Sequence, residues 1–341
     1  MRLDHYMAAC LLDPQAGYYA TRDPFGQAGD FITAPEISQL FGEMLGLCLA
    51  QVWMDQGAPA CFTLAEAGPG RGTLMADILR VLARVPGMLE AADIHLVEAS
   101  PTLREVQAKT LEHHQVTWCE RVEDLPETAP LFFVANEFID ALPIRQFTRT
   151  ETGWAETQVG AEDDTLRAGL SPATRLALLE PRFALTRPGD IVEICPQAVP
   201  VVEAVAARVR HGGMAIFVDY GGWRSLGDTF QALEKHEPVD PFACPGQADL
   251  TAHVDFEPLA QAAVAAGLAV SEMTAQGVLL ERLGITQRAQ ALAGKLSDAA
   301  LEDHIAAHRR LTHPSEMGQL FKALAFVPQG APMPPGFAPA G

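Results

Sequence analysis

Short apolar segments alternate with segments of helical periodicity from residue 61 onward. This alternation is typical of right-handed βαβ units, which build a mainly parallel sheet with helices on both faces. We therefore predict an α/β fold. The expected strands are Cys61–Ala65, Ile94–Val97, Val116–Trp118, Leu131–Ala135, Met214–Asp219, Leu268–Met273 and Phe321–Val327, and the expected helices include Thr73–Arg84, Pro101–Glu112 and Gln197–Arg210.

Several stretches interrupt this alternation. Prolines and glycines are dense in residues 1–40 and indicate ordered loops, followed by a helix from about Thr33 to Met54. Residues 144–193 read as a hairpin and a helical piece around 171–179, and the tail after Pro328 is expected to be loose. The predicted parts are a lid and helix segment at 1–60, a core at 61–143 and 194–327 with a helical insertion at about 278–312, an inserted hairpin and helix subdomain at 144–193, and a flexible tail at 328–341.

The charge of the chain limits its partners. The sequence has 24 Lys and Arg against 43 Asp and Glu, which gives a formal net charge of -19. A phosphate backbone or an anionic membrane surface would repel such a chain, whereas a basic protein partner would not. The six cysteines form no C-x-x-C pair and indicate free thiols. No apolar run approaches the roughly 20 residues of a membrane span, so we expect a soluble, cytosolic protein.

A glycine-rich loop follows the first predicted strand directly. Glycines at three alternate positions let the backbone bend tightly and let a ligand approach main-chain N–H groups at the start of a helix. An ordinary tight turn between strand and helix is the alternative interpretation. The loop residues are Glu66, Gly68, Gly70 and Gly72.

The spacing of this loop indicates which ligand it binds. A dinucleotide site would need a third glycine where Thr73 stands, and a phosphate P-loop would need a G-K-[ST] sequence that is absent. The pattern acidic-x-G-x-G-x-G is instead typical of sites for S-adenosyl-L-methionine. Glu98 ends the next strand, where a carboxylate can accept both ribose hydroxyl groups, unless it is a solvated surface residue. Adenine would then lie near residues 118–122, although Trp118 could equally belong to the core.

Polar residues also follow the fourth predicted strand. Asn136, Glu137 and Asp140 come just after a buried strand, at the sheet edge where open α/β folds bind their ligands. Carboxylates here could hold a cationic nitrogen nucleophile in line with a methyl group. Helix capping by Asn136, with Asp140 on a solvated face, is the alternative.

Two further segments carry residues that could belong to the site. The run from Gly29 to Thr33, with Asp30 inside it, suits a lid over the amino-acid end of the cofactor or a plain structural loop. His253 lies between two aspartates, where a structural pair is the preferred interpretation. The remaining histidines lack metal-ligand spacing, so no metal is expected.

Taken together, these motifs closely resemble the MidA-like methyltransferases, a family that includes a mitochondrial complex I assembly-factor arginine methyltransferase. The matching runs are Gly17–Tyr19, Gly29–Ser38, Glu66–Leu74, Val97–Ser100, Ala135–Pro143 and Asp249–Phe256. The resemblance implies a class I methyltransferase (Rossmann-like) sheet. It also implies that Glu66, the three loop glycines, Glu98, Ala99, Asp30 and Thr33 bind the cofactor and that Glu137, Asp140 and Asn136 are catalytic.

The resemblance further implies transfer of a methyl group to a protein arginine, with symmetric dimethylation of a respiratory complex I subunit or a bacterial equivalent as the expected reaction. A bacterial cytoplasmic location is expected, and the mitochondrial matrix is the alternative. The partner is a protein that presents an arginine, and the oligomeric state is open, with a homodimer as one option. An assembly factor that binds the cofactor without catalysis and a small-molecule methyltransferase are competing hypotheses. A nicotinamide oxidoreductase is the weakest.

Overall fold

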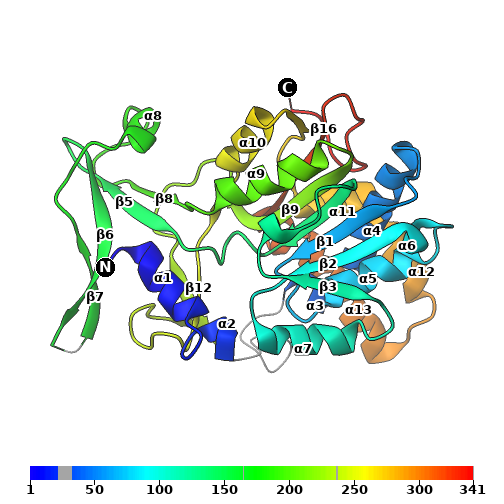
Figure 1. Cartoon of the computed structure of the whole chain (residues 1–341). Helices are drawn as coiled ribbons and strands as arrows, with labels where there is room; N and C mark the ends of the chain where they lie inside the picture. Colours follow the sequence, from blue (N-terminus) through cyan, green and yellow to red (C-terminus); the bar gives the residue numbers. More distant parts are fainter. Residues whose placement is uncertain (22–32, 164, 236, 341) are drawn as a thin grey trace.

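The computed structural model describes residues 1–21, 33–163, 165–235 and 237–340. Its centre is a mainly parallel sheet with the strand order β14-β16-β9-β4-β1-β2-β3 (Figure 1). Strands β1 to β4 and β9 run parallel to one another, whereas β16 pairs antiparallel with both β9 and β14. The predicted α/β fold is confirmed. The bounds are β1 Phe62–Ala67, β2 Ala92–Val97, β3 Val116–Cys119, β4 Leu131–Asn136, β9 Gly213–Gly222, β14 Leu268–Val270 and β16 Phe321–Pro328.

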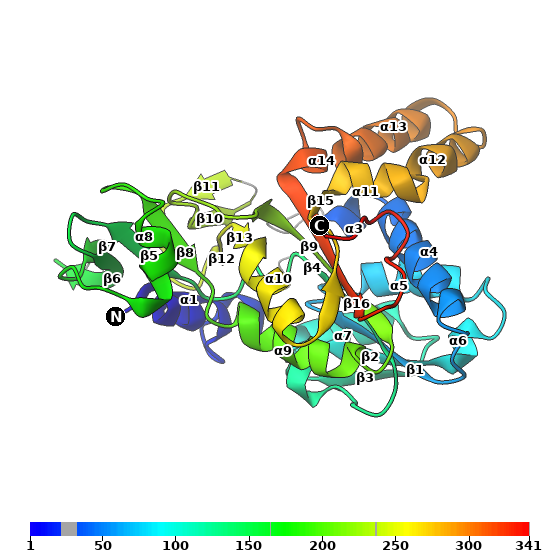
Figure 2. The same ribbon diagram turned by 90° about the horizontal axis from the view of Figure 1, so that it is seen from above.

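Both faces of the sheet are covered by helices. Along β4, Phe132 and Val134 pack into one core and Phe133 and Ala135 into another, because successive side chains point to opposite faces of a strand. Helices α4 (Gln39–Asp55) and α5 (Thr73–Leu82) cover the first face, and α9 (Ala198–Val209) and α10 (Phe256–Ala265) cover the second. The two pairs lie on opposite sides of β16 in Figure 2. A strand buried on both faces explains why β4 reads as one continuous apolar run.

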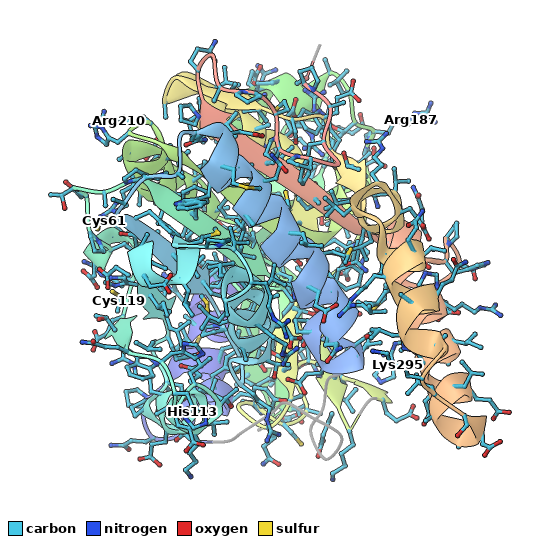
Figure 3. All side chains as sticks on the ribbon, turned by 90° about the vertical axis from the view of Figure 1, so that its right-hand side faces the viewer. Cys61, His113, Cys119, Arg187, Arg210 and Lys295 are labelled. Atoms are coloured by element: carbon cyan, nitrogen blue, oxygen red, sulfur yellow. The ribbon has the colours of Figure 1, made fainter. Side chains whose placement is uncertain are left out.

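A group of helices precedes the last strand. They pack beside α4 and stand out at one side of the molecule, with Lys295 labelled at the connection between two of them (Figure 3). This arrangement places helices in the region where the sequence predicts a helical insertion. Their bounds are α11 Gln276–Leu283, α12 Ile285–Ala293, α13 Asp298–Thr312 and α14 Met317–Leu320, preceded by the short strand β15 Thr274–Ala275.

Two smaller sheets lie at the other end of the molecule, beside the N-terminus (Figure 1). One has the order β7-β6-β5-β8 and the other β11-β10-β12. Helix α1 (Leu3–Leu12) packs against both β6 and β12 and so joins the two sheets. The bounds are β5 Arg145–Arg149, β6 Trp154–Glu162, β7 Thr165–Leu170, β8 Ile191–Ile194, β10 Gln231–Glu234, β11 Glu237–Val239 and β12 Asp249–Thr251. The short strand β13 Val254–Asp255 pairs with β9 of the central sheet.

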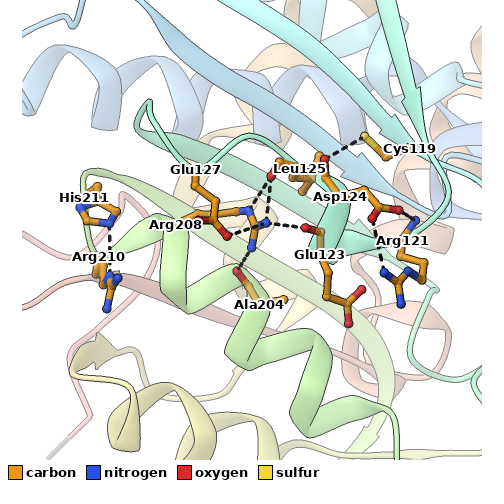
Figure 4. Close-up of polar contacts among 10 residues, drawn as sticks. All are labelled: Cys119, Arg121, Glu123, Asp124, Leu125, Glu127, Ala204, Arg208, Arg210 and His211. Carbon is orange, nitrogen blue, oxygen red and sulfur yellow. Dashed lines mark hydrogen bonds and ion pairs between the residues drawn. The ribbon is translucent and has the colours of Figure 1, made fainter.

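Arg208 connects α9 to the loop before β4. Its guanidinium is 2% exposed and donates to the carbonyl oxygens of Leu125, Glu123 and Ala204 at 2.7 to 3.0 Å, as Figure 4 shows. A buried cation is costly unless its N–H groups are satisfied, and here main-chain oxygens satisfy them. The contact fixes the short 3₁₀ turn η1 (Val122–Asp124) against α9.

The structure corrects several local predictions. Residues 3–12 form helix α1 rather than loops, because the proline and glycine residues begin only at Asp13-Pro14. The helix expected from Thr33 is split into α3 (Ala34–Ile37) and α4, because Ser38 is extended and caps the second helix through its hydroxyl group. The helical piece expected at 171–179 lies later, at η2 Ala177–Leu179 and α8 Glu180–Phe183. The run Asp249–Phe256, one of those that carry the family resemblance, forms the short strands β12 (Asp249–Thr251) and β13 (Val254–Asp255) and the first residue of α10.

The expectation of a loose tail after Pro328 is also wrong for its described residues. Met333 and Phe337 pack against the core, and the N–H of Glu272 donates to the carbonyl oxygen of Ala338 at 2.8 Å. Apolar side chains between the prolines give this segment a surface to bury.

Within the described ranges, no helix combines the length and apolar character of a membrane span, and the cysteines are free thiols.

Candidate functional site

The glycine loop lies at the switch point of the sheet, between β1 and α5, where strand order reverses and open α/β folds bind ligands. Gly68 has a φ of +62°, and a Cβ there would meet Cδ2 of Phe138 at 2.9 Å. Gly72 has a φ of +82° and stands at the N-terminus of α5. Only glycine fits the first position without strain. The N–H of Gly68 donates to the carbonyl oxygen of Val97 at 3.1 Å and that of Gly72 to the carbonyl oxygen of Pro69 at 2.7 Å, so these bonds fix the turn in front of the helix start.

A cavity of about 510 Å³ opens beside this loop. This volume is within the roughly 300–1,000 Å³ of small-molecule sites. Five of the residues predicted for the site line it, namely Gly68, Gly70, Glu98, Ala99 and Glu137. Apolar residues of the loop after β4 and Tyr19 from the front of the chain complete its wall. Gly72 and the residues expected near adenine, 118–122, do not line it.

Glu98 is held in place by a network of hydrogen bonds. Its carboxylate accepts from the N–H of Ser100 at 2.7 Å and from Nε2 of Gln107 at 3.1 Å. Gln107, which is fully buried, also donates to the carbonyl oxygen of Gly70 at 2.8 Å and accepts from the indole of Trp118 at 2.9 Å. Trp118 therefore supports the site from behind through Gln107. Gln107 is not among the predicted site residues, because its place on α7 (Pro101–Thr110) gives no signal in the sequence.

A smaller cavity continues from the loop toward the front of the chain. Thr33, Glu36, Glu66 and Asn136 line it together with Gly68 and Glu137. The hydroxyl of Thr73 donates to Glu36, and the N–H of Ala34 donates to Glu137 at 3.1 Å. These bonds hold the segment after Thr33 against the glycine loop. Asp30 and the rest of the predicted lid from Gly29 to Ile32 lie outside the described residues.

Glu66 is the most deeply buried acid of the loop. It is 2% exposed, its Oε2 has no hydrogen-bond partner among the described residues, and burial raises its pKa to about 8. The N–H of Met75 and the charge of Asp77 act on it in opposite directions. An unpartnered buried oxygen beside the loop is a place where a donor group of a ligand would be satisfied.

The predicted catalytic residues meet at the end of β4. Glu137 has a φ of +50°, unusual for a residue with a side chain, and its Oε1 accepts from Nδ2 of Asn136 at 3.2 Å. Burial and the nearby charge of Asp140 raise the pKa of Glu137 to about 7. Burial likewise raises the pKa of Asp140 to about 6. One side-chain oxygen of Asn136 and one of Asp140 have no partner within the described part of the chain.

Asp219, near the carboxyl end of β9, is a site residue outside the predicted set. Its Oδ2 accepts from the main-chain N–H groups of Phe138, Ile139 and Asp140 at 3.0 to 3.3 Å. Burial and the charges of Asp140 and Glu137 raise its pKa. The loop after β4 is therefore fixed by a carboxylate from the neighbouring strand. The position of Asp219 at the carboxyl end of a predicted strand was the available signal.

The residues present fit S-adenosyl-L-methionine. The glycine loop offers main-chain N–H groups at a helix start, Glu98 presents a carboxylate to the larger cavity, and Glu66 and Asn136 leave buried oxygens unsatisfied in the smaller one. Such a combination matches a ligand that carries a ribose and, beyond it, a charged amino-acid group. Within the described ranges, no group of three or more His, Cys, Asp or Glu is arranged to hold a metal ion.

Comparisons with known proteins agree with this fit. Residues 44–274 match the family model described as "Putative S-adenosyl-L-methionine-dependent methyltransferase". The chain is 36% identical to "Protein arginine methyltransferase NDUFAF7, mitochondrial" of Xenopus tropicalis, over 98% of this chain and 84% of that protein. It is also 36% identical to the protein of the same name from Homo sapiens, over 95% and 79%.

A solved structure shows the same similarity in three dimensions. The crystal structure of a Burkholderia thailandensis protein bound to S-adenosyl-homocysteine is 30% identical and superposes with a TM-score of 0.85, covering 98% of this chain and 89% of that one. S-adenosyl-homocysteine is what remains of the cofactor after its methyl group has been transferred. The resemblance drawn from the sequence motifs is thus confirmed: this chain belongs to the MidA-like family of S-adenosyl-L-methionine-dependent methyltransferases.

Proposed function

We propose that the chain methylates a guanidinium nitrogen of an arginine in a protein substrate. The observation that carries the proposal is the group of buried carboxylates at the ends of β4 and β9, with Oδ1 of Asp140 and Oδ1 of Asn136 unpartnered. The relatives named protein arginine methyltransferases support it, as does the predicted role of these residues. Glu66, Gly68, Gly70, Gly72, Glu98, Ala99, Asp30 and Thr33 are proposed to hold the cofactor.

The chemistry of arginine explains why carboxylates are needed. Its guanidinium is cationic at neutral pH and presents planar N–H groups, so Glu137 and Asp140 would bind it by charge-assisted hydrogen bonds. Bound S-adenosyl-L-methionine supplies an electrophilic methyl group on sulfur. Glu137 and Asp140 would hold one guanidinium nitrogen with its lone pair facing that methyl group. The nitrogen that gains the methyl group loses one proton, and the carboxyl of Glu137, with a pKa of about 7, is suited to receive it.

The finer predictions rest on the family resemblance. Symmetric dimethylation of a respiratory complex I subunit, or of a bacterial equivalent, is proposed on that ground. The bacterial cytoplasm and the mitochondrial matrix are the two proposed locations, and the relatives' names favour the second. A homodimer and the division into core, front segment and inserted subdomain also stay proposals.

A Glu137→Gln variant tests the proposal against an assembly factor that binds cofactor without catalysis. Binding of S-adenosyl-homocysteine is measured by calorimetry, and transfer of a tritiated methyl group to protein is measured with candidate acceptor proteins. We expect the variant to bind within a few-fold of the wild type and to lose transfer. Glu90→Gln, an exposed acid on α6 (Met88–Ala91), is the matched control and should retain both.

If the wild-type protein labels small molecules and no protein, the arginine proposal fails in favour of a small-molecule methyltransferase. If it transfers no label at all while it binds cofactor, the non-catalytic hypothesis replaces it. Unchanged transfer by Glu137→Gln would remove this residue from the proposed mechanism.

A further inference from the structure

A third cavity, of about 520 Å³, lies between the sheet domain and the β7-β6-β5-β8 sheet. Helices α9 and α10 form one wall, and η2, α8 and β8 form the other. None of its lining residues lines either of the two cavities at the glycine loop. We call this cavity the docking groove.

One end of the docking groove reaches the proposed acceptor site. Ile139 and Ile144 line it, and Asp140 follows Ile139 directly in the chain. Ala252 also lines the groove, and its N–H donates to the carbonyl oxygen of Asp140 at 3.0 Å. The ring of His253 packs edge-on against Tyr220, and the hydroxyl of Tyr220 acts to lower the pKa of Asp140. The groove and the carboxylates thus share one wall, the loop after β4.

The lining of the docking groove is largely aliphatic. One of its leucines, Leu178, is 68% exposed and is therefore accessible to an occupant of the groove. An aliphatic surface of this depth is suited to apolar side chains of a bound chain. The aliphatic lining residues are Ile139, Ile144, Leu178, Leu179, Val192, Ile194, Val199 and Val254.

The charges of the docking groove are unbalanced toward acid. Arg182 pairs with Asp255 at 3.1 Å, and Arg224 pairs with Glu257, so both arginines are neutralised. Glu203 on α9 is exposed and has no ion pair or hydrogen bond within the described ranges. A basic side chain of an occupant opposite Glu203 would therefore strengthen its binding, whereas an acidic side chain there would not.

We propose that the docking groove binds a segment of the protein substrate, with aliphatic and basic side chains, next to the arginine that is methylated. The inference rests on the proposed arginine methylation and adds the part of the substrate that selects it. Because the groove ends beside Asp140, the segment and the target arginine lie within a few residues of each other in the substrate chain.

The probe is a fluorescein-labelled 15-residue peptide with one arginine, followed by three leucines and two lysines. Two comparison peptides replace the leucines by serines or the lysines by glutamates. Binding is measured by fluorescence anisotropy to the full chain with S-adenosyl-homocysteine present. We expect each comparison peptide to bind at least tenfold more weakly than the first.

Three variants locate the binding. Gln261→Trp on α10 fills the groove, and Glu203→Lys reverses its charge, since both residues are exposed and line it. Each should weaken the leucine-lysine peptide at least tenfold and leave the affinity for S-adenosyl-homocysteine unchanged. Val264→Trp, on the same helix but 59% exposed outside the groove, is the control and should bind the peptide like the wild type.

Three results would overturn the proposed docking groove. They are equal binding of all three peptides, no binding of the leucine-lysine peptide by the wild type, and an equal loss of peptide affinity in Val264→Trp and Gln261→Trp. These outcomes are separate from those of the proposed function, because anisotropy reports binding whether or not a methyl group moves. If Gln261→Trp leaves methyl transfer to protein arginine unaffected, the proposed activity is supported and the docking-groove proposal is contradicted.

Discussion

Glu66 gives the most quantitative prediction. This carboxyl group is 2% exposed, and burial raises its pKa from the ordinary 4.5 to about 8. Between pH 4.5 and pH 8 the folded protein holds a proton on Glu66 that the unfolded chain releases. The contribution of Glu66 to stability is therefore fully present below pH 4.5 and is lost as the pH rises through 8. At about 1.36 kcal/mol per pKa unit, ionisation of Glu66 removes up to about 5 kcal/mol of folding free energy above pH 8.

A Glu66→Gln variant removes this dependence. The amide stays neutral at every pH and keeps an oxygen that can accept from the N–H of Met75. Since the other buried carboxyl groups are present in both proteins, their contributions cancel in the difference. We therefore expect the stability of the variant relative to the wild type to rise by about 3 to 5 kcal/mol between pH 5 and pH 9.

The assay is urea unfolding of the cofactor-free proteins, followed by tryptophan fluorescence at both pH values. Glu90→Gln serves as the control, because this acid is exposed and its substitution should leave the pH dependence unchanged. A Glu66→Gln protein that loses as much stability as the wild type on going to pH 9 would refute the burial argument.

Three further predictions concern the site itself. Gly68→Ala should weaken S-adenosyl-homocysteine binding at least tenfold, as measured by calorimetry. Gly57→Ala, at a similar φ of +87° but in open space, is the control and should not weaken it. Equal effects of the two substitutions would exclude the steric argument. Methyl transfer should rise with pH through about 6 to 7 as Asp140 and Glu137 ionise to bind a cation, and a flat rate profile in the wild type would contradict their role. Asp219→Ala removes the acceptor of three main-chain N–H groups and should lower kcat at least tenfold with cofactor affinity nearly unchanged. Asp219→Asn should recover part of the lost kcat. An unaltered kcat in the alanine variant would contradict a positioning role for Asp219.

The sequence predicts the central sheet well because its signals are local. Strand β4 is a continuous apolar run, and the loop from Gly68 to Gly72 combines a strand end with a helix start, so both are visible without knowledge of the fold. The polar residues after β4 could be placed near the cofactor because carboxyl ends of parallel strands meet at one edge of a sheet.

What the sequence did not predict depends on contacts between distant segments. Asp219 binds N–H groups 79 to 81 residues away, and Gln107 joins Gly70 to Glu98, and neither contact has a local pattern. Helix α1 was not predicted, because the many prolines and glycines that follow it indicated loops for the whole front segment. The tail was expected to be loose from its prolines, although Phe337 finds a core surface that only the folded chain provides.

The central claim is that this methyltransferase acts on arginine in a protein. Its most direct test is acid hydrolysis of protein acceptors labelled with tritiated S-adenosyl-L-methionine, followed by chromatographic identification of the labelled amino acid. We expect label in methylated arginine, with symmetric dimethylarginine as the final product, and no label with Glu137→Gln. Label recovered in methylated lysine, histidine or a carboxyl ester would contradict it.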